Sequence, residues 1–122
     1  YQDSAGGGVL IENPNEPKVH DLSVEELAQW ISEGKEVTVY DVRPETERAI
    51  AKLDFALPFT PAAQQELMQQ DKNSVIVFQC RSGGRSLQAG KHFALQGFSN
   101  VYNLVGGINA WAARVDSSIK QY

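Results

Sequence analysis

Segment 80–86, which reads CRSGGRS, contains residue types that stabilise a negatively charged sulfur atom. Cys80 is the single cysteine of the 122-residue chain, and two arginines follow it within the segment. Gly83 and Gly84 permit backbone conformations that turn successive amide groups inward, where they bind anions. Positive charge and amide donors of this kind lower the pKa of a thiol. We therefore predict that the segment is a cradle for a thiolate, or for an anion bonded to that sulfur.

A purely structural role for Cys80 is the main alternative, because a buried cysteine often only packs against its neighbours. The position of the residue favours chemistry. The apolar run 74–78 before it is typical of a strand buried on both faces, and the pattern after it predicts a helix over about 86–96. In such sheets, ligands bind beyond the carboxyl ends of the strands, and a helix that starts there directs its free amides toward them.

The elements expected along the chain alternate between strand and helix. Ser23 and Glu26 match a capping box for a first helix that ends at Gly34, and Gly106 and Gly107 predict a late turn. The expected strands cover about 37–42, 53–57, 74–78 and 100–104, and the expected helices cover about 24–33, 45–51, 61–70, 86–96 and 108–113. This alternation predicts an α/β fold with a parallel sheet and helices on both faces.

Composition indicates one compact domain and limits its partners. The chain is 42% hydrophobic and 21% charged, as ordinary globular domains are. A net charge of −4 argues against a nucleic-acid partner, and no stretch approaches the roughly 18 apolar residues that span a membrane. One cysteine excludes an internal disulfide and, with two histidines, argues against a metal site. It also fits a reducing compartment, so we expect a cytoplasmic location.

The two ends of the chain differ from its middle. Residues 1–19 contain three consecutive glycines and two prolines, so we expect a flexible linker or the remnant of an upstream domain. The chain starts at Tyr1 without a secretory signal pattern, which leads us to expect a domain of a larger protein or a processed chain. We expect the domain itself over 20–116 and a C-terminal tail over 117–122.

Three segments together resemble one known family. CRSGGRS resembles the active-site loop of single-domain rhodaneses, which are sulfurtransferases. YDVRPETE at 40–47 resembles the family's first signature, and NLVGGINAW at 103–111 resembles its C-terminal signature. The matches cover about residues 20–115 in the family's order, and three matches at consistent spacing are specific where one alone is weak. The resemblance implies a five-stranded parallel sheet with helices on both faces.

The resemblance also implies a reaction and a set of site residues. Cys80 would attack the outer sulfur of thiosulfate or of a persulfide, carry that sulfur as a persulfide, and pass it to cyanide or a thiol. Backbone amides of the loop would hold the anionic sulfur, Arg85 would attract the anionic donor, and Arg81 would act at the pocket mouth. The implied binding residues are Arg81, Ser82, Gly83, Gly84, Arg85 and Ser86. No metal or organic cofactor is implied.

Other parts of the signatures are expected to support the pocket. We predict that Asp41 and Arg43 form a structural ion pair beside it, and that Glu47 pairs with a basic group. A typical member places Gly, His and Gly where this chain has Ala51, Lys52 and Phe55. Because that segment shapes one wall near the pocket, the departure puts donor preference in doubt, while the catalytic loop is intact.

Two other functions remain open from the sequence. Cys80 could accept a persulfide from a dedicated protein donor, so that the domain is a relay or regulatory module of a multidomain protein with poor thiosulfate activity. A phosphatase is less favoured, because phosphatases of related fold place five residues between cysteine and arginine, whereas four separate Cys80 from Arg85. Gln79 also stands where such phosphatases carry a histidine.

Overall fold

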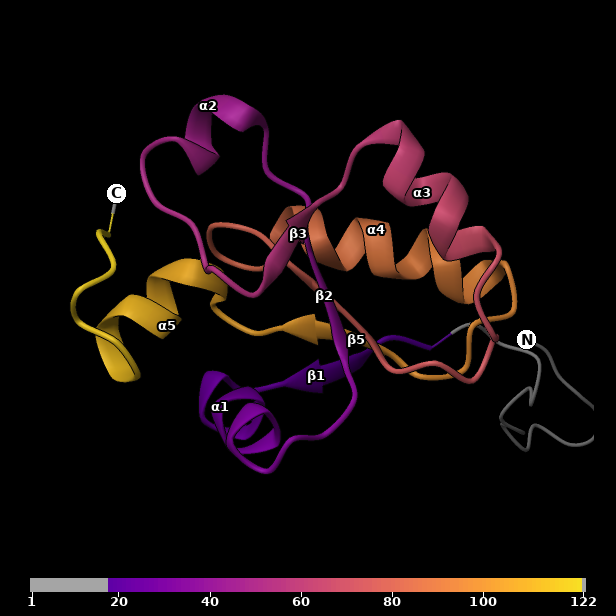
Figure 1. Ribbon diagram of the computed structural model, residues 1–122, viewed down its shortest axis with the longest axis horizontal. Helices are drawn as coiled ribbons and strands as arrows, with labels where there is room; N and C mark the ends of the chain where they lie inside the picture. The colour runs from indigo at the N-terminus through magenta and orange to yellow at the C-terminus, as the bar shows by residue number, and fades with distance from the viewer. Residues whose placement is uncertain (1–17, 122) are drawn as a thin grey trace, which may run out of the picture.

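The computed structural model describes residues 18–121, and within them strands alternate with helices (Figure 1). The elements are β1 (His20–Leu22), α1 (Val24–Ser32), β2 (Thr38–Asp41), α2 (Glu45–Arg48), β3 (Ala56–Pro58), α3 (Pro61–Met68), β4 (Ile76–Gln79), α4 (Gly84–Leu95), β5 (Val101–Leu104) and α5 (Gly107–Arg114). Most of the segment expected to be a linker or domain remnant, 1–17, lies outside the described residues.

The sheet has five strands in the order β1-β5-β4-β2-β3, and every neighbouring pair is parallel. In the central strand, Val77 lies opposite Val39 on one side and Tyr102 on the other. Because all strands run the same way, their carboxyl ends lie together at one end of the sheet. The loop from β4 to α4, which contains Cys80, lies at this carboxyl end. The predicted α/β fold with a five-stranded parallel sheet is therefore confirmed.

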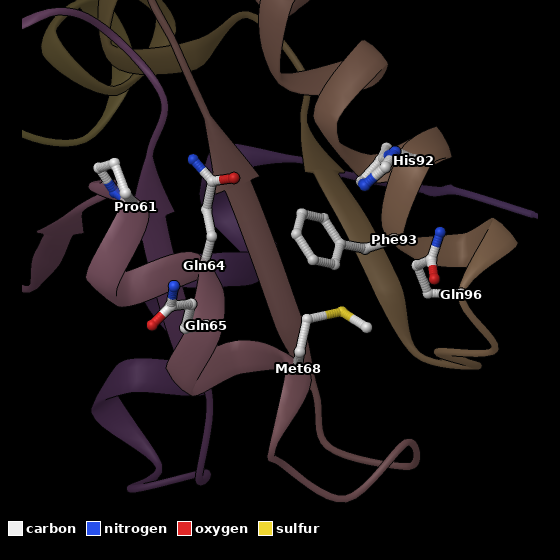
Figure 2. A pocket seen from close by; sticks show the side chains of 7 residues that line it. All are labelled: Pro61, Gln64, Gln65, Met68, His92, Phe93 and Gln96. Atoms are coloured by element: carbon white, nitrogen blue, oxygen red, sulfur yellow. The ribbon is translucent and has the colours of Figure 1, made fainter.

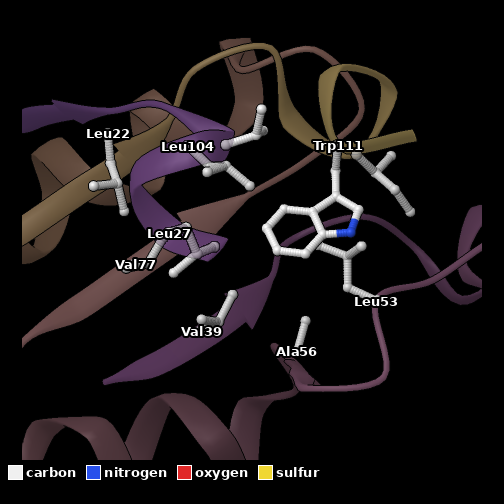
Figure 3. Close-up of a cluster of buried hydrophobic side chains, with 10 residues drawn as sticks. Leu22, Leu27, Val39, Leu53, Ala56, Val77, Leu104 and Trp111 are labelled. Carbon is white, nitrogen blue, oxygen red and sulfur yellow. The ribbon is translucent and has the colours of Figure 1, made fainter. Parts of the chain in front are cut away.

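Helices cover both faces of the sheet, as predicted. One core cluster fills the space between the sheet and helices α1 and α5, where Leu27 and Trp111 meet Val77 (Figure 3). The second cluster lies under α3 and α4, where Leu67 and Phe93 pack against the sheet. Successive side chains of β4 point alternately into the two clusters, which is why its sequence is apolar at nearly every position.

Local capping explains where the longer helices begin. The Ser23 hydroxyl accepts a hydrogen bond from the amide of Glu26 at 3.1 Å, and the Glu26 carboxylate accepts one from the amide of Ser23 at 3.0 Å. The predicted capping box is therefore present. Thr60 caps α3 through the amide of Ala63 at 3.1 Å, directly before Pro61 at the first helical position.

Three expected element boundaries and one strand need correction. Strand β1 was not expected, because it has three residues and forms only by pairing with β5 at the edge of the sheet. The strand expected over 53–57 is Ala56–Pro58, because Leu53 turns into the core and its carbonyl accepts the amide of Ala56. Pro58 is tolerated because β3 is an edge strand.

The helix expected over 45–51 ends at Arg48. The chain beyond it leaves the helix, and the Ala51 carbonyl accepts a hydrogen bond from the Arg43 guanidinium at 2.7 Å. The helix expected from about residue 86 starts at Gly84, because Gly83 adopts a left-handed conformation with φ of 113° and serves as its N-cap. The last part of the cysteine loop is therefore the first turn of α4.

Candidate active site around Cys80

Cys80 lies directly after the central strand and is buried, with 1% of its surface exposed. Two amides at the start of α5 hold the backbone around it. The amide of Ile108 donates to the Cys80 carbonyl at 2.9 Å, and the amide of Asn109 donates to the Arg81 carbonyl at 3.2 Å. The free N-terminal amides of α5 thus fix the start of the cysteine loop.

Gly107 makes this close approach possible. Its φ is 56°, which is the left-handed region, and a Cβ at this position would overlap the Cys80 carbonyl oxygen and lie 2.7 Å from the Arg81 carbonyl oxygen. Only glycine satisfies both conditions. The sequence pattern predicted a turn at Gly106 and Gly107 but gave no sign that the second glycine lies against the cysteine loop.

The Cys80 sulfur has two polar groups within hydrogen-bond distance. The amide of Gly83 donates to it at 3.1 Å, and the Ser86 hydroxyl oxygen lies 3.4 Å away. Burial by itself raises the pKa of the Cys80 thiol, but the Ser86 hydroxyl and the amides of Ser86, Gly83 and Ser82 outweigh it, and the pKa falls below that of an ordinary thiol. The site therefore stabilises the thiolate more than the surroundings of an ordinary thiol do, despite its burial.

Ser86 connects the sulfur to a residue that the sequence did not single out. Its side chain is fully buried, and its hydroxyl donates to the side-chain oxygen of Asn103. The hydroxyl also lies 3.2 Å from the Gly83 carbonyl oxygen. Asn103 belongs to β5, next to β4 in the sheet, and is 6% exposed. In the sequence, only the place of Asn103 within the C-terminal signature pointed to a role for it. That place does not identify Ser86 as the partner of Asn103.

The Arg85 guanidinium points to Glu47 on α2. Its two terminal nitrogens lie 2.7 and 2.8 Å from the two carboxylate oxygens, which is a bidentate ion pair. The Arg85 side chain is 46% exposed and the Glu47 side chain 24% exposed. The basic partner predicted for Glu47 is therefore the arginine that was predicted to attract the anionic donor.

Asp41 and Arg43 form the predicted ion pair at the end of β2. The guanidinium of Arg43 donates to the Asp41 carboxylate at 2.7 and 2.9 Å, and both side chains are fully buried. Arg48 adds a contact to Asp41 at 3.2 Å. Arg43 also donates to the Glu47 carbonyl at 3.4 Å. This network positions the backbone of α2, and with it the carboxylate that binds Arg85.

The remaining loop residues contribute backbone groups. The side chains of Arg81 and Ser82 are exposed, and Ser82 supplies one of the amides that lower the pKa of Cys80. Gly84 is the first residue of α4. The first three predicted binding residues, 81–83, thus lie in the loop and the last three, 84–86, in the first turn of α4, and the amides of Ser82, Gly83 and Ser86 act on the sulfur.

Segment 51–55 contains the three positions at which this chain departs from the typical family sequence. The Ala51 carbonyl oxygen accepts a hydrogen bond from Arg43, and Lys52 is exposed. The ring of Phe55 packs against Trp111 of α5, with 5.1 Å between ring centroids. The Phe55 ring, which stands where typical members have glycine, therefore fills space between this segment and α5.

A separate groove lies between α3 and α4 and has a volume of about 370 Å³ (Figure 2). It is lined by Pro61, Gln64, Gln65, Met68, His92, Phe93 and Gln96, and no residue of the cysteine loop contributes to it. Within residues 18–121, no cluster of three or more His, Cys, Asp or Glu side chains is placed to hold a metal ion, and no helix has the length and apolarity needed to cross a membrane.

Comparison with known proteins finds relatives that match most of the chain. The family model of the rhodanese-like domain matches residues 23–114. A protein named "Sulfurtransferase" from Allochromatium vinosum is 35% identical over 98 residues, which cover 77% of this chain and 89% of the relative. The "Rhodanese-like/PpiC domain-containing protein 12, chloroplastic" of Arabidopsis thaliana is 35% identical over 115 residues, which cover 85% of this chain but 38% of the relative.

A crystal structure of a rhodanese-like domain protein from Staphylococcus aureus has the same fold. It superposes with a TM-score of 0.68 at 24% identity and covers 85% of this chain and 99% of the other. The chain therefore belongs to the family of rhodanese-like domains, which includes proteins named sulfurtransferases. It spans 89% of the Allochromatium relative and 38% of the Arabidopsis one.

Proposed function

We propose that this protein is a sulfurtransferase that carries one sulfur atom as a persulfide on Cys80. The observation that carries the proposal is the polar setting of the buried sulfur, to which the Gly83 amide donates at 3.1 Å and beside which the Ser86 hydroxyl lies at 3.4 Å. Hydrogen bonds of this kind stabilise a charged sulfur more than a neutral one. The donor would be thiosulfate or a persulfide, and the acceptor cyanide or a thiol.

The reaction has two balanced steps. The Cys80 thiolate attacks the outer sulfur of thiosulfate, a new S–S bond forms, and sulfite leaves with the electron pair of the S–S bond that breaks. The terminal sulfur of the resulting persulfide is anionic, and the loop amides stabilise it. The acceptor nucleophile then attacks that sulfur, and Cys80 leaves again as the thiolate, which completes a ping-pong cycle.

A protein persulfide donor is the second candidate, and the Glu47–Arg85 pair favours it. Because Glu47 already neutralises the Arg85 charge in the resting protein, a small dianion gains less from that arginine than it would from a free one. A persulfide on a partner protein depends less on charge attraction and more on surface contact. On this reading the domain relays sulfur within a larger assembly.

The experiment that tests the proposal measures thiocyanate formation from thiosulfate and cyanide, and the same reaction with glutathione persulfide as donor. We expect turnover with at least one donor in the wild type and none in Cys80→Ser, since a serine hydroxyl cannot form the persulfide. Folding of the variant is checked by circular dichroism. Equal turnover in Cys80→Ser, or hydrolysis of p-nitrophenyl phosphate in place of sulfur transfer, would overturn the proposal.

A further inference from the structure

The Ser86 hydroxyl has one proton and three acceptors around it. These are the Cys80 sulfur, the Gly83 carbonyl oxygen at 3.2 Å and the side-chain oxygen of Asn103. It can donate to only one of them well at a time. When the proton points to Asn103, the Ser86 oxygen offers lone pairs to the sulfur, which suits a neutral thiol. When the proton points to the sulfur, the hydroxyl donates a hydrogen bond that stabilises a thiolate.

Asn103 can decide between these two states. Its side-chain oxygen accepts from Ser86, whereas its side-chain nitrogen has no hydrogen-bond partner among the described residues. A half-turn of the amide exchanges the two atoms with almost no change of shape. The nitrogen would then donate to the Ser86 oxygen and release the Ser86 proton to the sulfur. Asn103 is 6% exposed, so most of its side chain is shielded from water.

We propose that Asn103 is a positioning residue that sets the direction of the Ser86 hydroxyl proton and so controls how readily the Cys80 sulfur carries a negative charge. In the thiol state, the Asn103 oxygen accepts from Ser86, and the Cys80 S–H can donate to the Ser86 oxygen. When the thiol loses its proton to solvent, the amide turns, its nitrogen donates to Ser86, and Ser86 donates to the thiolate. The inference deepens the proposed function, because it concerns the thiolate on which that function rests.

The charged groups already present near the loop are the same in every variant, and Asn103→Asp adds one carboxylate to them. Arg81 and Arg85 lie on the loop itself, and Glu47 binds Arg85 from α2. Asp41 and Arg43 pair at the end of β2. The start of α5 that packs on the loop, 107–109, contains no ionisable side chain, whereas Asp21 of β1 lies opposite Asn103 in the sheet register. A difference between variants therefore reports the change at Asn103, including its added charge, and the Ser86→Ala background separates the part that passes through Ser86.

The test is the pH profile of Cys80 alkylation by iodoacetamide, which measures the thiolate and requires no sulfur transfer. In Asn103→Asp, the carboxylate can only accept, so it holds the Ser86 proton away from the sulfur. We expect the midpoint to rise by about one pH unit and the rate at pH values well below both midpoints to fall about tenfold. Asn100→Asp is the matched control, because it adds the same charge at the opposite end of β5, where Asn100 contacts Asn73. It should shift the midpoint little.

The effect must pass through Ser86. In a Ser86→Ala background, Asn103→Asp should shift the midpoint by less than half as much as in the wild type. An unchanged midpoint in Asn103→Asp, or an equal shift in both backgrounds, would overturn the proposal. A failure of sulfur transfer in the wild type would instead remove the proposed function and leave these profiles informative.

A second measurement on the wild type covers the case in which Asn103→Asp does not fold. In nitrogen-15-labelled protein, one side-chain amide proton of Asn103 should move downfield as Cys80 titrates, because it gains a hydrogen bond to Ser86. The same proton should not move in Ser86→Ala. Movement in Ser86→Ala, or none in the wild type, would contradict the proposed change of orientation.

Discussion

Under the proposed function, Glu47 and Arg85 are the two side chains expected to affect the sulfur donor most directly. Their bidentate contact at 2.7 and 2.8 Å joins α2 to the first turn of α4 across the mouth of the cysteine loop. A dianion that approaches Cys80 must compete with the Glu47 carboxylate for the guanidinium. The pair is partly exposed, so solvent screens it and the competition is modest. We therefore expect donor preference to depend on Glu47, which lies outside the loop, as well as on the loop itself.

Glu47→Gln should lower KM for thiosulfate about two- to fivefold, the range expected for a partly exposed ion pair. Removing the carboxylate frees the Arg85 charge for the donor. Arg85→Ala should raise KM instead. Glu45→Gln is the control, because Glu45 lies on the same helix but is 81% exposed and contacts Arg48 only at 3.7 Å. Steady-state kinetics at low ionic strength measure all three, and equal KM values in the wild type and Glu47→Gln would show that thiosulfate does not meet Arg85.

Helix α5 acts as a clamp on the site because of the way it begins. Its first free amides, at Ile108 and Asn109, bind carbonyl oxygens of Cys80 and Arg81. Its body packs into the core through Trp111 (Figure 3). The rigid helix thus connects the loop backbone to the hydrophobic cluster that stabilises the domain. This connection is most sensitive to substitution at Gly107, because the loop leaves no room for a side chain there.

Gly107→Ala should destabilise the domain more than Gly34→Ala. Both glycines have positive φ, at 56° and 74°, but a Cβ at Gly34 meets nothing within 4 Å. Backbone strain alone costs about 1 kcal/mol, and overlap with the loop carbonyls should add about 2 kcal/mol at Gly107. Urea denaturation gives the two free energies of unfolding. Similar losses in the two variants would mean that the loop moves aside at little cost.

At the scale of the whole molecule, the central strand β4 joins the two core clusters and ends at the site. Gln79, its last residue, is fully buried, and neither its side-chain nitrogen nor its side-chain oxygen has a hydrogen-bond partner among the described residues. It lies opposite Asp41 in the sheet register. An unpaired buried amide costs free energy that an apolar side chain of the same shape would not. The domain therefore tolerates a destabilising residue directly before Cys80.

Gln79→Met should raise the free energy of unfolding by about 1–3 kcal/mol, since it removes the unpaired amide with little change in volume. Gln69→Met is the control, because Gln69 is exposed and should change stability by less than about 0.5 kcal/mol. Thermal and urea unfolding measure both. A loss of stability in Gln79→Met would show that the amide of Gln79 has a partner, such as a buried water, that the variant removes.

The features that could be predicted from the sequence depend on neighbours close in the chain. The capping box of α1 needs only Ser23 and Glu26, and β4 stands out because both its faces are buried. The cysteine loop is also continuous, so its residues and their likeness to one family were visible together. Strand β1 could not be predicted, because its three residues become a strand only by pairing with residues about 80 positions away.

The parts of the site that were missed come from contacts between distant segments. Asn103 reaches Ser86 from a neighbouring strand, and Gly107 reaches the loop from the start of α5. The pairing of Glu47 with a basic group was predicted, but its partner was not, since 38 residues separate it from Arg85. Residue types at these positions show what each side chain can do, while the fold decides which groups meet.

The most direct test of the central claim is the intact mass of the protein after brief exposure to thiosulfate and, separately, to a persulfide donor. We predict a gain of one sulfur atom on Cys80, its removal by cyanide or a reductant, and no gain in Cys80→Ser. A folded wild-type protein with a free thiol that gains no sulfur from either donor would contradict the account.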